Sequence, residues 1–196
     1  VDCTIRVEAV NKITVDILGV EAQNSAYTGL PAAGYVGTPR VEIPYEGIPT
    51  ILPVDFNYYY FGTGSTVYAD YYHAPVEVGT YQTAITVAET NENYIGIIWL
   101  NFEITKAEAV CVPPQEKQSL SYCGEAQALV TAGSTGDGTM VYALREEGPY
   151  TGEIPMGTDA GTYTVWYKVL GDRNHYDSAP RSLSVTVEKA AAAVLQ

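Results

Sequence analysis

The sequence predicts an all-β protein made of two tandem β-sandwich units. Apolar residues recur at every second position in many short stretches, which is the period of a strand with one buried face. The 18 Gly and 11 Pro interrupt these stretches as turn residues do between strands. Helical periodicity is nearly absent, and only residues 188–195 (EKAAAAVL) have a helix-favouring composition. A chain of 196 residues is long enough for two small cores.

A repeat divides the chain into these units. The tripeptide GTY at residues 79–81 recurs at residues 161–163. Further along, LNFEITKA at residues 100–107 aligns with LSVTVEKA at residues 183–190, so that the apolar positions of the two segments coincide. Self-similarity at this spacing indicates one structural unit used twice.

The repeat sets the domain boundaries. We place the first unit at residues 12–107 and the second at residues 108–190. Residues 1–11 look like the end strand of a preceding repeat or an N-terminal strand, and residues 191–196 are expected to be a linker. The predicted partners of each unit are therefore neighbouring repeats in an array that continues beyond both ends.

The early half of the first unit is longer than that of the second. The extra residues fall around residues 34–53 (GYVGTPRVEIPYEGIPTILP), which contain four prolines. A proline lacks the N–H that a sheet ladder needs, so this stretch is predicted not to be a continuous central strand.

Alternation assigns the faces of the strand that begins with GTY in each unit. One side of each strand is apolar and is predicted to face the core, whereas the other side is polar or mixed. The predicted inward residues are Tyr81, Ile85 and Val87 in the first unit and Tyr163, Val165, Tyr167 and Val169 in the second. The predicted outward residues are Gln82, Ala84 and Thr86, and Thr164, Trp166 and Lys168.

Charge narrows the range of partners. Ten Lys and Arg stand against 23 Asp and Glu, giving a formal net charge of −13, and no run of basic residues occurs. Nucleic acid and anionic membrane surfaces are poor partners for such a chain, because both require clustered cations. No apolar run is long enough for a membrane-spanning helix.

No catalytic motif is visible. His73 and His175 have no nucleophile or carboxylate at a recognised motif spacing, and we expect both to be loop residues. The glycine-rich segments at residues 62–66 and 133–138 lack the Lys-Ser/Thr pair of a phosphate-binding loop. We therefore predict no enzymatic activity and no cofactor.

Three further side-chain groups have structural and functional interpretations. Cys111 and Cys123 are close enough in sequence to form a disulfide in an oxidising compartment, and the alternative is two free thiols. The acidic turns at residues 89–94 and 172–177 offer oxygen ligands for calcium, but their spacing fits no calcium motif, and we predict no metal site. Lys106 and Lys189 occupy equivalent strand ends, where we expect solvated lysines.

Exposed aromatic residues are the strongest candidates for a ligand or partner patch. By alternation, Trp99 and Trp166 lie on the faces opposite the cores of their units. Tyr59, Tyr71 and Tyr72 add aromatic side chains that the inward face cannot all accommodate. Such rings stack on sugars and anchor protein contacts, and they also cover sheet edges or pack between modules.

Both units resemble known bacterial repeats. In the second unit, YCGEAQALVTAG, GTMVYAL, IPMGTDAGTYTVWYKVLGDRNHYDSAP and SVTVEKA occur in this order. They resemble the immunoglobulin-like repeats of large surface proteins of gut bacteria. In the first unit, AYTGLP, FNYYYFGTGSTVY, APVEVGTYQTAITV, NENYIG and FEITKA resemble the related MBG domain, although residues 37–53 are less typical.

The resemblance implies two tandem immunoglobulin-like β-sandwich domains in a bacterial protein that is extracellular or on the cell surface. It brings no catalytic residues and no common ligand. We expect a stalk or spacer as found in adhesin-like proteins. The alternatives are a module that binds glycans or a host surface protein through its exposed aromatics, and an accessory segment of a carbohydrate-active enzyme.

Overall fold

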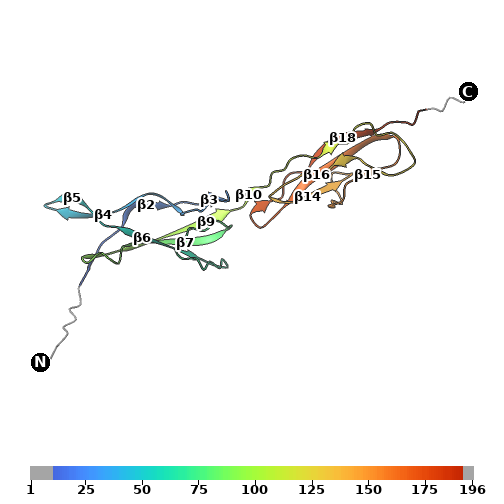
Figure 1. Ribbon diagram of the computed structural model, residues 1–196. Coiled ribbons are helices and arrows are strands. Elements are labelled where there is room, and N and C mark those ends of the chain that lie inside the picture. The colour runs from blue at the N-terminus through green and yellow to red at the C-terminus, as the bar shows by residue number, and fades with distance from the viewer. Residues whose placement is uncertain (1–10, 192–196) are drawn as a thin grey trace, which may run out of the picture. The chain divides into compact units, whose positions relative to one another are not determined.

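The computed structural model describes residues 11–191 and is all-β (Figure 1). The chain divides into two compact units between Thr105 and Lys106, next to the predicted boundary at residue 107. The predicted strand at residues 1–11 and the linker at residues 191–196 fall almost entirely outside the described residues. No helix in the described part of the chain has the length and apolarity needed to cross a membrane.

Two sheets build the first unit. One has the strand order β3-β9-β7-β6 and the other has the order β2-β4-β5. Two pairings are parallel, β1 with β8 and β3 with β9, and the remaining neighbours are antiparallel. The strands are β1 Ile13–Thr14, β2 Leu18–Ala22, β3 Ser25–Ala26, β4 Tyr35–Tyr45, β5 Ile48–Leu52, β6 Phe56–Gly62, β7 Gly79–Val87, β8 Tyr94–Ile95 and β9 Ile97–Thr105.

The core of the first unit lies between these sheets. Val41 from β4 shares one buried cluster with Ile85 and Val87 from β7, which joins the two sheets as in a β-sandwich. Tyr81 is also buried, so the predicted inward face of β7 is confirmed. Ala84 lies on the outer face, as predicted, but its side chain is buried. Its cross-strand neighbours are larger and cover the methyl group.

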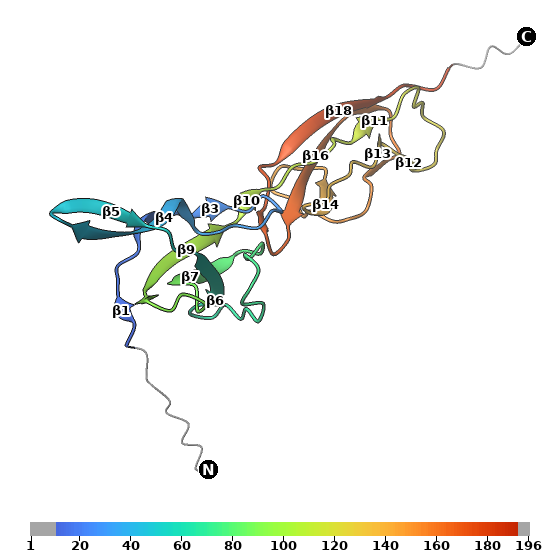
Figure 2. The same cartoon turned by 60° about the vertical axis from the view of Figure 1, so that its left-hand side comes forward.

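The additional residues of the first unit form a β-hairpin. β4 is a continuous strand, so the expectation that its prolines would interrupt it is wrong. The first half of β4 pairs with β2 and the second half pairs with β5, so no residue of β4 has partners on both sides. Each half is an edge, where proline is tolerated. The hairpin of β4 and β5 extends beyond β7 and β9 (Figures 1 and 2).

The second unit is built around a three-stranded antiparallel sheet, with β16 between β14 and β18 (Figure 2). Short pairs complete it: β10 with β17, β11 with β13 and β12 with β15. Its strands are β10 Ala107–Glu108, β11 Gln115–Glu116, β12 Gln127–Ala128, β13 Val130–Thr131, β14 Gly138–Ala143, β15 Met156–Gly157, β16 Gly161–Gly171, β17 His175–Tyr176 and β18 Arg181–Val187. Val165, Tyr167 and Val169 are buried and Tyr163 packs against the core, as predicted.

The two units share their strand register. Tyr81 of β7 stands opposite Phe102 of β9, and Tyr163 of β16 stands opposite Val185 of β18. The tyrosine hydroxyl in each unit donates to a carbonyl at the preceding turn: Tyr81 to Glu77 at 2.8 Å and Tyr163 to Asp159 at 2.9 Å. The GTY repeat therefore marks the same hydrogen-bonded corner in both units.

Candidate functional site

The outer face of the β6-β7-β9 sheet holds the aromatic residues that the sequence singles out in the first unit. Three rows of side chains cross this face, and we call them the outer face. From β6 through β7 to β9 the rows are Asn57, Thr86 and Ile97; Tyr59, Ala84 and Trp99; and Phe61, Gln82 and Asn101. The middle row places Tyr59 and Trp99 on either side of the small Ala84. Two large rings thus flank a low central position.

Ring contacts fix the aromatic side chains against one another. Phe61 lies 5.6 Å from Trp99 and 5.4 Å from Tyr71 between ring centroids, and Tyr59 lies 5.8 Å from Tyr72. Tilted pairs at these distances are favourable aromatic arrangements. Trp99 is still 48% exposed and Tyr72 is 73% exposed. The rings are therefore held in place while part of their surface stays in contact with solvent.

The loop that carries Tyr71 and Tyr72 is attached to β6. The backbone N–H of Tyr60 donates to the carbonyl of Tyr71 at 2.9 Å. Within the loop, Nδ1 of His73 lies 2.9 Å from both carboxylate oxygens of Asp70, and this hydrogen bond lowers the pKa of Asp70. His73 is thus a loop residue, as predicted, and it helps to hold the turn that presents both tyrosines.

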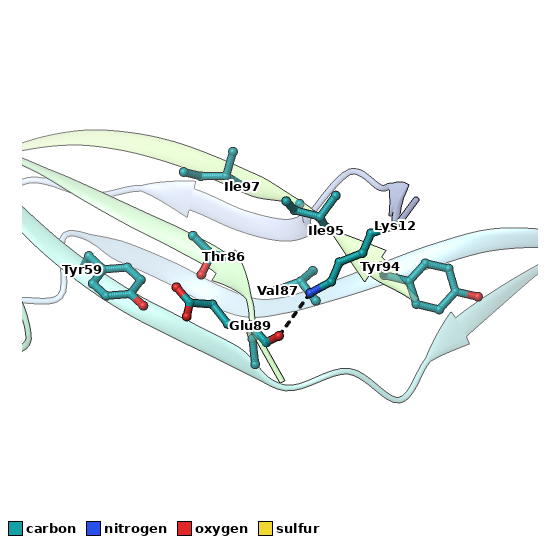
Figure 3. Close-up of a pocket in the computed structure, with 10 residues that line it drawn as sticks. Lys12, Tyr59, Thr86, Val87, Glu89, Tyr94, Ile95 and Ile97 are labelled. Atoms are coloured by element: carbon teal, nitrogen blue, oxygen red, sulfur yellow. Dashed lines mark hydrogen bonds between the residues drawn. The ribbon is translucent and has the colours of Figure 1, made fainter. Parts of the chain in front are cut away.

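A groove of about 290 Å³ continues from the outer face (Figure 3). It runs from Tyr59 past Thr86 and Ile97 to Lys12. The Lys12 ammonium donates to the carbonyl oxygen of Glu89 at 3.1 Å and closes this end. Alternation along β9 already places Ile97 on the same face as Trp99, but no local signal in the sequence brings Lys12 to it.

The second tryptophan belongs to the other unit. Trp166 occupies the equivalent row on β16, between Ala143 of β14 and Ser182 of β18. It is half-buried, and it makes no ring contact with another described residue. The structure therefore groups Trp99 with Tyr59, Tyr71 and Tyr72, and it does not place Trp166 in that cluster.

Both cysteines of the second unit are free thiols in the structure. Cys111 packs against the hydrophobic core, whereas Cys123 is exposed and its Sγ lies 3.8 Å from the carbonyl oxygen of Glu125. The structure shows the free-thiol alternative rather than the disulfide, because the two side chains lie in different environments.

The acidic turn of the second unit uses its carboxylates to cap backbone groups. Asp172 accepts from the N–H of Asn174 at 2.8 Å, and Asp177 accepts from the N–H of Gly171 at 2.9 Å. Nδ1 of His175 also lies 2.8 Å from Asp172. Among residues 11–191, no group of three or more His, Cys, Asp or Glu side chains is placed to hold a metal ion.

Acidification should destabilise the second unit through Asp172. The hydrogen bond from His175 and the N–H of Asn174 lower the pKa of Asp172 below its ordinary 3.8. A depressed carboxyl pKa contributes stability that is present above pH 3.8 and is lost as the pH falls through the lowered value. In urea unfolding at pH 5 and pH 3, Asp172→Asn should lose less stability than the wild type. An equal loss in both proteins would contradict this assignment.

Lys106 is not the solvated lysine that the sequence predicts. Its ammonium donates to the carbonyl oxygens of Asp172 at 2.9 Å and His175 at 3.1 Å, whereas Lys189 is exposed. Lys12 makes the corresponding contact in the first unit. A lysine at the start of each unit thus fastens the turn that precedes the closing strand.

Comparison of the chain with protein-family models, with curated proteins and with solved structures finds no match.

Proposed function

We propose that the chain is a pair of non-catalytic, immunoglobulin-like modules that act as a stalk or spacer in an extracellular or surface-attached bacterial protein. The shared register of the units supports a repeated module of this kind. The bond from each GTY tyrosine to a carbonyl four residues earlier is the arrangement known as a tyrosine corner in immunoglobulin-type sandwiches.

One observation carries the mechanical part of the proposal: an early strand of each unit pairs in parallel with the closing strand. In the first unit Ala26 pairs with Thr105, and the N–H of Tyr27 donates to the Thr105 carbonyl at 2.8 Å. In the second unit Ser121 pairs with Glu188, and the N–H of Tyr122 donates to the Glu188 carbonyl at 2.8 Å. The same contact therefore recurs in both units.

Parallel pairing of the first and last strands determines how a unit responds to force. When the two chain ends are pulled apart, these strands slide past each other, so their hydrogen bonds are loaded together rather than broken one by one. A high barrier to forced unfolding would follow, and forced unfolding depends on that barrier. This is the property that a spacer under tension requires.

Single-molecule pulling tests the proposal. The wild type should give two unfolding events, one for each unit. Tyr122→Pro removes the N–H that donates to Glu188 and should lower the unfolding force of the second unit alone. Tyr122→Ala is the matched control, because it removes the exposed ring and keeps the N–H. Equal forces for wild type and Tyr122→Pro would contradict the proposed clamp.

A further inference from the structure

We propose that the outer face of the first unit, together with the groove that continues from it, binds a neutral polysaccharide. This goes beyond a spacer, because it assigns a ligand to one face of one unit. The inference rests on the geometry of the rings, on the polar groups between them and on the distribution of charge.

The rings offer surfaces for stacking that are fixed before a ligand arrives. Phe61 contacts both Trp99 and Tyr71, and Tyr59 contacts Tyr72, so the indole and phenol rings are held by neighbours. Pre-organised side chains lose little conformational freedom on binding. Tyr59 and Trp99 stand two strands apart, about 10 Å at the usual strand spacing. A sugar chain lying across Ala84 can contact both rings with its C–H faces.

Hydrogen-bonding groups lie on the same face as the rings. Nε2 of Gln82 donates to Oδ1 of Asn101 at 2.9 Å, beside Phe61. This bond uses one donor and one acceptor of the two amides and leaves others available for a ligand. On the opposite side of the Tyr59 row lie the amide of Asn57 and the hydroxyl of Thr86. Apolar rings bordered by amides and a hydroxyl match a sugar, which has C–H faces and a rim of hydroxyls.

The charge pattern favours a neutral ligand. The chain carries a formal net charge of −13, yet none of the nine side chains in the three rows is charged. An acidic polysaccharide would be repelled by the surrounding protein and would find one cation in the groove, Lys12, which is already bonded to Glu89. A basic partner would find no carboxylate in the rows.

The equivalent face of the second unit lacks this arrangement. Its corresponding row consists of Ala143, Trp166 and Ser182, so a single ring stands where the first unit has Tyr59 and Trp99. Lys168 takes the position of Thr86 and lies over the Tyr150 ring at 4.9 Å. The second unit therefore provides an internal control that has a tryptophan on the same face but no paired rings.

Affinity electrophoresis in gels containing a soluble polysaccharide tests the proposal. The probes are mixed-linkage β-glucan, xylan, galactomannan and amylopectin as neutral polymers, and polygalacturonate as an acidic one. The wild type should be retarded by at least one neutral polymer and not by polygalacturonate. Trp99→Ala and Tyr59→Ala should each weaken binding by about tenfold or more, and Trp166→Ala should leave it unchanged.

Three results would overturn the proposal: no retardation by any neutral polymer, retardation by polygalacturonate alone, or an equal loss of binding in Trp99→Ala and Trp166→Ala. Urea unfolding of each variant must match the wild type, and Trp99→Phe should retain part of the affinity because it keeps a ring at that position. None of these substitutions touches the contact of Tyr27 with Thr105. The stalk can therefore pass its pulling test when the glycan test fails, and the reverse also holds.

Discussion

Tyr81→Ala should unfold or severely destabilise the first unit while the second unit stays folded. The Tyr81 ring is 2% exposed, stacks on Phe102 at 5.5 Å and meets Tyr68 edge-on at 5.7 Å. Removing a buried aromatic ring costs about 3–5 kcal/mol. The lost hydroxyl also leaves the Glu77 carbonyl without this donor. Small domains have only about 5–15 kcal/mol of stability, so most of the first unit's stability would be lost.

Tyr81→Phe separates the contribution of the hydrogen bond from that of the ring. It keeps the contacts with Phe102 and Tyr68 and should cost about 1–2 kcal/mol, the usual penalty for removing one partner of a partly buried hydrogen bond. Urea unfolding of each unit, followed by amide hydrogen exchange, would measure both variants. If the second unit lost as much stability as the first in Tyr81→Ala, the two units could not be independent folding units.

The sequence was sufficient to predict the all-β class, the repeat and the inward face of the GTY strands. These features depend on local periodicity, and a strand that must bury one face keeps its register wherever the unit occurs. The apolar positions of Tyr81 and Tyr163 therefore coincide in the alignment and in the structure. The immunoglobulin-like topology itself stays a proposal that rests on the resemblance and on the tyrosine corners.

Contacts between distant segments account for what the sequence could not predict. Ala84 is buried because Tyr59 and Trp99 come from two other strands, and their rings cover a residue that alternation places outside. Lys106 reaches the turn at Asp172 through the fold of the whole second unit. The grouping of Trp99 without Trp166 likewise depends on strand order, which a pattern of single residues does not contain.

Gly34→Ala should strongly destabilise the first unit. Gly34 has a φ of +77°, a conformation that costs a residue with a side chain about 1–2 kcal/mol. A Cβ at this position would lie 2.1 Å from the ring of Phe102, which is only 4% exposed and cannot move into solvent. Forcing an extra methyl into a packed core costs a further 1–3 kcal/mol or so. The expected loss is therefore about 2–5 kcal/mol.

Gly47→Ala isolates the backbone part of this effect. Gly47 has a similar φ of +81°, but it lies in the turn of the β4–β5 hairpin, where an added Cβ would meet nothing within 4 Å. This variant should lose only about 1–2 kcal/mol in urea unfolding, the backbone cost alone. The difference between the two variants then measures how firmly Phe102 is held against the segment before β4. Equal losses would mean that the core can yield at Gly34, and that the contact with Phe102 is not what requires a glycine there.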